Sequence, residues 1–443
     1  MKSYSHTIKL FLVFFISTII IFVRGRTAFL YPNLFVEDGY FFSYMLNNHT
    51  IDQIGFMYAG YRSIVPNIVI YLSLFSPFLP LSPYLMALFC LFNSAAAFTL
   101  FGLRRFRYFI ENDDVRLIIC LIMVLLPTGD YVLQSNTVYS IWNSFFVLLL
   151  LIMLPVSSSK LATIFQTIIS LLIIFSHAMV LIIVPFCIYF LFKRPTLRDK
   201  IYHATLIAGV GLYMLTSVEP IKSETSFAPM NLGFGVQLVF ERVFFEGIFG
   251  NILRIELNQH TLYLAMAIGI MIGLSLVGLI YRWRTYLPKS VLEQFFMIGF
   301  LIVGMTMMPT ISRNLLLQRE SLLFDPWSAN RYFYVQQLLL ILVVLQLGYY
   351  RFIKSQILLG SITIKRMAVT TTAIIGLLWI GYLNYKHRPT FFNPPEQSGR
   401  EVIYFLSSLD KHLHDPAKAA QPIKLDRGVW SITYTGYDSS QKK

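Results

Sequence analysis

Charged residues are scarce in this sequence: Asp, Glu, Lys and Arg make up 13% of its 443 residues, whereas hydrophobic residues make up 56%. The mean hydropathy of +0.63 is higher than a water-soluble domain of this size needs. Cysteine is also rare. The three present, Cys90, Cys120 and Cys187, lie in apolar runs without paired spacing, so neither a disulfide framework nor a zinc site is indicated. These absences exclude a soluble enzyme and predict a chain solvated largely by lipid.

Apolar runs of about 20 residues recur between short polar breaks, which is the length that a helix needs to cross a bilayer. The runs are continuous rather than alternating, so helices are favoured over a barrel. The first run has no small-residue cleavage pattern after it and is interpreted as a retained span. We therefore predict an all-α polytopic membrane protein with about 11 transmembrane helices, at 8–23, 84–103, 117–129, 138–155, 161–175, 178–192, 201–217, 261–281, 290–308, 333–350 and 367–385.

The distribution of basic residues predicts the orientation of these spans. With this set of spans, loops 104–116, 193–200, 282–289 and 351–366 fall on one side together with the N-terminus and Lys160, and they hold half of the 36 basic residues. Most of the 22 acidic residues fall on the other side. Cytoplasmic loops are rich in Lys and Arg, so the N-terminus is predicted to be cytoplasmic and the C-terminus outside. The net charge of +14 thus indicates membrane orientation rather than nucleic-acid binding.

Two segments need separate interpretation. The stretch 62–79 is apolar enough to span, but counting it would invert every later loop, so we predict a helix on the outer membrane surface broken by Pro77, Pro80 and Pro83. The stretch 161–192 is short for two crossings, yet the Lys residues at both of its ends require an even number. A pair of short helices that turn near Ser176 and His177 satisfies both conditions.

The predicted organisation is a membrane domain over 1–385 and an extracytoplasmic tail over 386–443. On the outer side the membrane domain carries loops 24–83, 218–260 and 309–332. The tail is polar and contains prolines, and it either forms a small domain or packs against these loops.

The first outer loop contains adjacent carboxylates, Glu37 and Asp38, followed by Gly39. An acidic residue there can deprotonate an acceptor hydroxyl, coordinate a metal, or cap the helix that follows. Later in the loop, Tyr61 precedes Arg62, whose planar guanidinium suits phosphate oxygens while the aromatic ring suits a sugar. The alternative for Arg62 is a contact with lipid headgroups.

A third element contains Asp130, Asn136 and Trp142, where a loop re-enters the membrane. Amides and aromatic rings of this kind recur in carbohydrate sites, although Trp142 is equally typical of an interfacial belt. His177, at the turn between two short spans, is a candidate for the same cavity or a packing residue.

The fourth element is Arg331 and Tyr332 at the start of a late span. An Arg at a helix N-terminus on the outer surface is well placed to hold a lipid-linked phosphate, because the helix end also favours an anion. A contact with headgroups alone is the weaker alternative.

These elements resemble the GT-C superfamily of polytopic glycosyltransferases, which use polyprenyl-phosphate sugars, and within it the phage-type serotype-converting O-antigen glucosyltransferases. The resemblance implies that the acidic residue of the first outer loop is the base; we favour Asp38 over Glu37 because it is nearer the following helix and its glycine. Only some members of that superfamily use a divalent metal, so a metal is possible, but no ligand cluster here demands one and no cofactor is expected. The motifs that carry the resemblance are Glu37-Asp38-Gly39, Tyr58-Ala59-Gly60-Tyr61-Arg62, Gly129-Asp130 with Asn136 and Trp142, and Asn330-Arg331-Tyr332.

The expected function is transfer of a sugar, with glucose the expected one, from a polyprenyl-phosphate donor to a lipid-linked glycan such as the O-antigen of lipopolysaccharide. The reaction is expected on the periplasmic side of a bacterial inner membrane and inverts the anomeric centre, since one base and no second nucleophile is predicted. Arg331 and Arg62 would hold the leaving phosphate. Expected partners are the donor, the glycan acceptor, the bilayer, a donor synthase and a flippase, but no nucleic acid.

Two other classes stay open. A lipid or glycan transporter would carry ionisable residues inside its spans, where only Glu293 and His203 are predicted to lie. An O-antigen polymerase or ligase would carry a large Arg-rich outer loop late in the chain, and loop 309–332 is modest.

Overall fold

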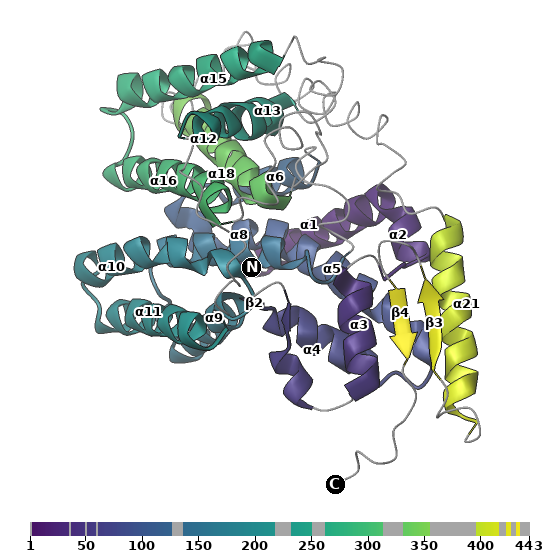
Figure 1. Cartoon of the computed structure of the whole chain (residues 1–443). Coiled ribbons are helices and arrows are strands. Elements are labelled where there is room, and N and C mark those ends of the chain that lie inside the picture. Colours follow the sequence, from purple (N-terminus) through teal and green to yellow (C-terminus); the bar gives the residue numbers. More distant parts are fainter. Residues whose placement is uncertain are drawn as a thin grey trace.

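The computed structural model of the chain describes residues 2–34, 37–48, 51–58, 61–125, 136–217, 232–249, 262–312, 331–354, 396–415, 422–426 and 431–434. These residues form a mostly helical protein with two short antiparallel hairpins (Figure 1). In the hairpins Met57 pairs with Arg62, and Ile423 pairs with Tyr434.

The described helices and strands lie in two stretches of the chain, one up to residue 217 and one from residue 232 onward. The first set is α1 (Lys2–Arg24), α2 (Arg26–Leu30), α3 (Glu37–Asn48), η1 (Ile51–Gly55), β1 (Met57–Tyr58), β2 (Tyr61–Arg62), α4 (Ile64–Ser73), η2 (Leu79–Leu81), α5 (Ser82–Thr99), η3 (Leu100–Gly102), η4 (Arg104–Tyr108), α6 (Asp113–Leu125), α8 (Ile141–Met153), α9 (Lys160–Ile174), η5 (Ala178–Ile183), α10 (Val184–Lys193) and α11 (Leu197–Ser217). The second set is α12 (Leu232–Leu238), η6 (Val239–Phe245), α13 (Glu246–Phe249), α15 (Leu262–Trp283), α16 (Lys289–Ser312), α18 (Arg331–Gly348), η8 (Tyr349–Lys354), α21 (Glu396–Leu413), β3 (Ile423–Asp426) and β4 (Ser431–Tyr434).

Five of the described helical segments are long and apolar enough to cross a membrane, so the predicted membrane character is confirmed. They are Ser5–Arg24, Leu79–Gly102, Tyr263–Trp283, Lys289–Met308 and Tyr332–Arg351. Each other predicted span up to residue 350 also overlaps a helix, although most of these helices are shorter. The predicted span 367–385 lies outside the described residues, and the count of eleven stays a prediction.

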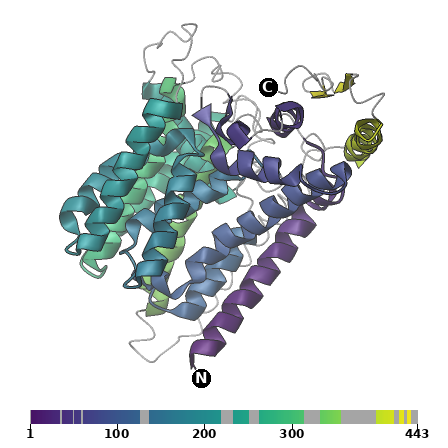
Figure 2. The same ribbon diagram turned by 90° about the horizontal axis from the view of Figure 1, so that it is seen from below.

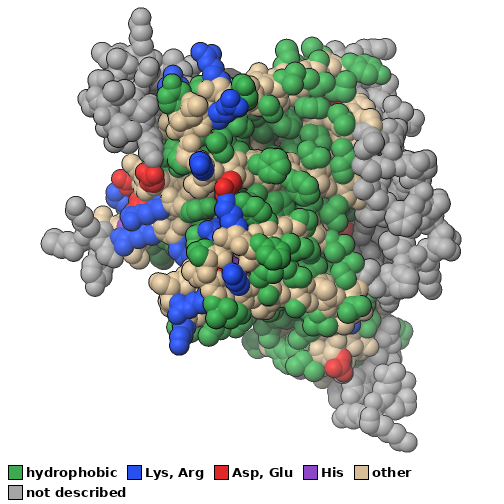
Figure 3. Space-filling view, turned by 90° about the vertical axis from the view of Figure 1, so that its left-hand side faces the viewer, with side chains coloured by type: hydrophobic (Ala, Val, Ile, Leu, Met, Phe, Trp, Pro, Cys, Tyr) green, Lys and Arg blue, Asp and Glu red, His purple; other side chains and the backbone are tan. Residues whose placement is uncertain are grey.

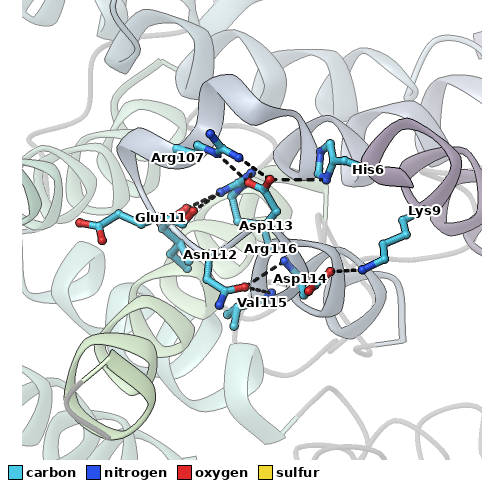
Figure 4. Close-up of polar contacts among 10 residues, drawn as sticks. His6, Lys9, Arg107, Glu111, Asn112, Asp113, Asp114, Val115 and Arg116 are labelled. Atoms are coloured by element: carbon cyan, nitrogen blue, oxygen red, sulfur yellow. Dashed lines mark hydrogen bonds and ion pairs between the residues drawn. The ribbon is translucent and has the colours of Figure 1, made fainter. Parts of the chain in front are cut away.

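Ion pairs fix the N-terminus of α1 to the basic loop 104–116 (Figure 4). The Lys9 Nζ atom donates to the Asp114 carboxylate at 2.7 Å, and the His6 Nδ1 atom lies 3.7 Å from the Asp113 carboxylate. Arg107 and the fully buried Arg116 both donate to the same Asp113 carboxylate. The N-terminus and the first basic loop therefore lie at one end of the bundle.

The next two basic loops lie at that same end. The Arg194 guanidinium packs over the Tyr108 ring at 5.3 Å, and an ion pair between Lys193 and Glu293 joins the end of α10 to the start of α16. Figure 3 shows a face dominated by hydrophobic side chains, with the Lys and Arg side chains gathered toward one side of it. This clustering of loops agrees with the parity of the predicted spans.

The opposite end of the bundle carries a second hydrophobic core, which joins the first outer loop to the tail. Its buried members come from α3 and its flanks, α4 to α5, α21 and β4, and include Phe41, Phe42, Leu406 and Ile432. The Asn47 Nδ2 atom donates to the Thr433 carbonyl at 2.7 Å. In Figure 2 the N-terminus lies at one end of the molecule, and the yellow tail elements lie at the other. The described elements of the tail therefore pack against the first loop.

The helix α4 is too short to cross a bilayer. Its 10 residues span roughly 15 Å, about half the thickness of the hydrocarbon core. The helix ends at Ser73, before the prolines predicted to break it. Its first turn contacts the turn after α9, because the Ile64 N–H donates to the Phe175 carbonyl at 3.3 Å. This geometry supports the prediction that 62–79 does not add a crossing.

Residues 232–249, within the predicted outer loop 218–260, form one continuous helix packed inside the bundle. A Cβ added to Gly269 of α15 would overlap the Phe240 carbonyl, and a Cβ added to Gly273 would lie 2.9 Å from the Phe240 ring and 3.5 Å from the Phe244 ring. The helix therefore packs closely against α15, and small residues of α15 allow this approach.

Candidate active site

Several candidate residues lie around the start of α8, at the end of the bundle opposite the N-terminus. Asp38, in the first turn of α3, is 4% exposed and accepts two backbone hydrogen bonds, from the Thr137 N–H at 2.9 Å and from the Val138 N–H at 3.0 Å. Burial raises the pKa of the Asp38 carboxyl to about 7, although the two N–H groups favour its ionised form. Asp38 thus positions the turn that precedes α8 and has both carboxylate oxygens engaged.

Glu37 lies beside Asp38 but is only partly buried. The Tyr139 hydroxyl lies 2.8 Å from both oxygens of the Glu37 carboxylate. Tyr139 is the hydrogen-bond partner that the described residues provide for this carboxylate, which leaves lone pairs to accept an incoming hydroxyl. Of the two adjacent acids, Glu37 is therefore better placed to accept a proton from a substrate.

Asn136 shapes the turn from which these partners project. Its side-chain oxygen accepts the Tyr139 N–H at 2.9 Å, and its carbonyl accepts the Ser140 N–H at 3.0 Å. Asn136 is buried. An Asn that accepts a backbone N–H three residues on is a typical device for starting a helix, so its described role is structural.

Three of the predicted residues form a contiguous aromatic cluster. The Trp142 ring meets the His177 ring edge-on at 4.4 Å and the Tyr332 ring edge-on at 5.6 Å, both between centroids. The Phe145 ring stacks on the His177 ring at 4.2 Å. The structure thus brings together α8, the turn before η5 and the start of α18, as the sequence hypothesis requires. Trp142 is 5% exposed, which disfavours an interfacial belt role.

The tautomer of His177 follows from its hydrogen bond. The Nδ1 atom accepts the Met179 N–H at 3.2 Å, so the proton of the neutral ring is assigned to Nε2. The Nε2 atom is buried and has no hydrogen-bond partner among the described residues. Burial lowers the pKa of His177 to about 3, so the ring is neutral at physiological pH. Its Nε2–H is therefore a hydrogen-bond donor without an acceptor among the described residues.

Arg62 offers a second donor of this kind. It is partly buried at the end of β2, and its Nε atom is buried without a hydrogen-bond partner in the described part of the chain. Three residues further on, the Val65 N–H donates to the Ser176 hydroxyl at 2.9 Å, next to His177. Arg62 and His177 therefore each lie close in sequence to the contact between the start of α4 and the turn after α9.

The remaining predicted residues are only partly described. Asp130 lies outside the described residues. Tyr61 and Arg331 contribute backbone to β2 and α18, but their side chains lie outside what the structure describes. No group of three His, Cys, Asp or Glu side chains in the described ranges could hold a metal ion.

Buried polar groups that sequence reasoning missed lie close to the cluster. The Tyr334 hydroxyl donates to the Asn143 side chain at 2.6 Å, and Asn143 donates in turn to Ser94 at 3.0 Å. Neither Asn143 nor Tyr334 stands out in sequence, because each is a single polar group inside an apolar span.

Three ionisable residues of the helix 232–249 are also buried. Glu241 and Arg242 are 0% exposed and Glu246 is 2% exposed. The Arg242 Nε atom lies 3.4 Å from the Glu246 carboxylate, and the Arg242 guanidinium packs over the Phe333 ring at 4.9 Å. Phe333 follows Tyr332, so this charge cluster adjoins the start of α18. The i, i+4 spacing of Arg242 and Glu246 is a helical signal in the sequence, although the segment is predicted above to be an outer loop.

In comparisons with known proteins, the chain matches no family model, no curated protein sequence and no solved structure. The chemistry of the described residues therefore carries the functional argument.

Proposed function

We propose that the protein is a membrane glycosyltransferase that moves a sugar from a polyprenyl-phosphate donor to a lipid-linked surface glycan. The observations that support this most are a partly exposed carboxylate and an imidazole donor that both contact the start of α8. The Glu37 carboxylate accepts the Tyr139 hydroxyl, and the His177 ring packs against Trp142. The Arg62 Nε and His177 Nε2 atoms are buried donors without a partner among the described residues. A transferase of this kind needs one base for the acceptor and several donors for the leaving phosphate.

In the proposed reaction the Glu37 carboxylate takes the proton of the acceptor hydroxyl. The acceptor oxygen attacks the anomeric carbon, and a new carbon–oxygen bond forms as the bond from that carbon to the phosphate oxygen breaks. The electron pair of the broken bond stays with the polyprenyl phosphate, whose growing negative charge is stabilised by Arg62, His177 and Arg331. A single displacement inverts the anomeric centre.

The roles proposed for the two acids differ from the sequence expectation, which favoured Asp38 as the base. A base must reach the substrate proton, and Asp38 is 4% exposed with both oxygens occupied by backbone N–H groups. We therefore assign proton acceptance to Glu37 and positioning of the turn 136–140 to Asp38. The Trp142 and Tyr332 rings would pack against a sugar.

The acceptor, the membrane and the sugar that we propose are those expected from the sequence. The acceptor would be a glycan such as O-antigen on the periplasmic side of a bacterial inner membrane, and glucose is the proposed sugar. A synthase would make the polyprenyl-phosphate donor and a flippase would deliver it. The reaction as proposed needs no cofactor.

The central experiment compares Glu37→Gln, Asp38→Asn and Asp52→Asn. Asp52 is an exposed carboxylate of the same loop and serves as the control. Membranes with each variant are supplied with synthetic polyprenyl-phosphate glucose and an O-antigen acceptor, and the added hexose is measured by mass spectrometry. Glu37→Gln should lower the rate by a factor on the order of 10² to 10⁴ at unchanged protein level, whereas Asp52→Asn should not. Normal transfer by Glu37→Gln would refute the assignment of the base.

The phosphate site is tested by donor kinetics. Arg62→Lys keeps the charge but loses the planar fork, and Arg331→Lys does the same at the start of α18. An Arg that binds the donor should raise the donor KM when replaced, and one that stabilises the leaving phosphate should lower kcat as well. Unchanged donor kinetics in both Arg62→Ala and Arg331→Ala would exclude these residues from the site.

A lipid or glycan transporter is the second candidate, and one specific observation favours it. Glu241, Arg242 and Glu246 are buried inside the bundle, where ionisable side chains commonly mark transport pathways. The two functions differ in their products. A transferase changes the mass of the acceptor, whereas a transporter moves an unmodified labelled lipid-linked glycan across a liposome membrane.

A further inference from the structure

A groove that the proposed reaction does not use opens between α10 and α16. Its volume is about 440 Å³. Aromatic and aliphatic side chains from both helices form its walls, and its principal lining residues are Phe186, Tyr189, Leu292, Glu293, Phe296 and Phe300. Except for Glu293 and the Tyr189 hydroxyl, these side chains are apolar, so the groove suits a hydrocarbon chain.

The surface around the groove faces the membrane. Phe296 is 79% exposed and Phe300 is 48% exposed on α16, and the neighbouring Ile188 on α10 is 44% exposed. Exposed apolar side chains on membrane-spanning helices contact lipid tails. The molecules available to fill this groove are therefore membrane lipids.

One end of the groove is charged. Lys193, the last residue of α10, forms an ion pair with Glu293 and donates to the Tyr189 hydroxyl at 2.7 Å. Lys289 lies one helical turn before Glu293 on α16. Two cations against one anion leave a net positive charge where the groove approaches the basic loops, so a negatively charged headgroup complements it.

We propose that this groove binds an acyl chain of an anionic phospholipid, with the headgroup phosphate against Lys193 and Lys289. The ligand differs from the donor lipid of the proposed transferase. The groove approaches the end of the bundle that holds the N-terminus, whereas the first turn of α8 belongs to the opposite end, so one polyprenyl phosphate cannot place its phosphate at both. The bound lipid bridges α10 and α16 beside the ion pair that already joins them.

The test uses the purified full-length protein in mild detergent and native mass spectrometry. Phosphatidylglycerol and phosphatidylcholine with identical acyl chains are titrated separately, and the dissociation constant of the first bound lipid is measured. Phosphatidylglycerol should bind about fivefold or more tightly, on the scale of one basic residue at an anionic lipid surface. Lys193→Gln and Lys289→Gln should each reduce this preference. Leu292→Trp should weaken both lipids by filling the groove.

Matched controls separate this site from general lipid contact. Lys200→Gln removes an exposed cation of α11 outside the groove, and Ile188→Trp adds the same bulk to the lipid-facing surface of α10 without lining it. Neither control should change the lipid preference. Equal affinity for the two lipids in the unmodified protein would overturn the proposal, as would a Leu292→Trp variant with unchanged binding. Displacement of phosphatidylglycerol by an equimolar polyprenyl phosphate would overturn the choice of occupant. Lys289→Gln alters an exposed side chain and keeps the test valid should Leu292→Trp fail to fold.

Discussion

The Tyr139 hydroxyl and the Glu37 carboxylate face each other at 2.8 Å across the junction between the first outer loop and α8. One hydroxyl proton is shared between two carboxylate oxygens, which orients the carboxylate without protonating it. A side chain held in this way loses less entropy when a substrate hydroxyl arrives.

Removal of this hydroxyl should lower activity without removing the base. In Tyr139→Phe the ring remains and the carboxylate loses its orienting donor, so kcat should fall about tenfold, as expected for one hydrogen bond to a charged group. Tyr71→Phe, in the same outer layer, is the control. Activity equal to that of the unmodified protein would show that Tyr139 serves only packing.

Stability should depend on pH through Asp38. Burial raises the pKa of its carboxyl to about 7 from an ordinary 3.8, so the folded protein binds this proton more tightly than the unfolded chain. The corresponding stabilisation is present below about pH 4 and is lost as the pH rises to about 7. Thermal unfolding in detergent should therefore show the advantage of the unmodified protein over Asp38→Asn shrinking across that range. A constant difference between the two proteins would contradict the raised pKa.

The packing of α15 against the helix 232–249 can be tested with two glycines of one helix. Gly269→Ala places a methyl group against the Phe240 carbonyl, while Gly278 has open space where a Cβ would be added. Both changes favour the helical backbone equally, so their difference isolates the clash. Gly269→Ala should be less stable than Gly278→Ala by about 1–3 kcal/mol in a denaturant titration. Equal stability would mean that the two helices do not approach so closely.

The buried pair of Arg242 and Glu246 should tolerate joint replacement better than single replacement. Arg242→Met leaves a carboxylate in the bundle without this cation, at a cost of about 3–5 kcal/mol, whereas changing both residues to Met removes both charges. The amount of folded protein from fluorescence size-exclusion chromatography provides the measurement. A double variant that is worse than either single variant would indicate that the charges have separate roles.

Orientation is tested by reporter fusions. Fusions after Arg107, Arg198 and Arg284 should report the cytoplasm, because these positions lie in the basic loops at the N-terminal end. Fusions after Asn48 and in the tail should report the outside. A cytoplasmic signal after Asn48 would place the proposed active site on the wrong side for a periplasmic reaction.

The sequence predicted the helical membrane fold because apolar length and loop charge are direct consequences of the bilayer. It also named His177, Trp142 and Tyr332 among the candidate residues, while it left a packing role for His177 and an interfacial role for Trp142 open; the rings of His177 and Tyr332 both contact the Trp142 ring in the structure. It could not rank Glu37 against Asp38. That choice depends on which carboxylate meets the N–H groups of Thr137 and Val138, and a contact across 99 positions leaves no local pattern.

Residues 232–249 are predicted from sequence to be part of a loop, although they form a helix, because they contain charged residues. Its charged residues lower the apparent length of the apolar run, and in a single-sequence pattern a charge indicates water. In the folded bundle Arg242 instead has Glu246 and the Phe333 ring as neighbours. Tertiary contacts can stabilise a buried charged side chain in place of water, and the hydrophobic pattern of a sequence does not show which contacts will form.

The outer core has a consequence for the order of biogenesis. It joins residues 386 positions apart, as in the contact of Asn47 with Thr433, and a ribosome delivers the first of these long before the second. Phe41 and Phe42 are therefore made long before α21 and the final hairpin, which pack with them in the same core. This second core becomes complete only after α21 and β4 have been synthesised, so the segment that contains α3 acquires its full packing at the end of synthesis.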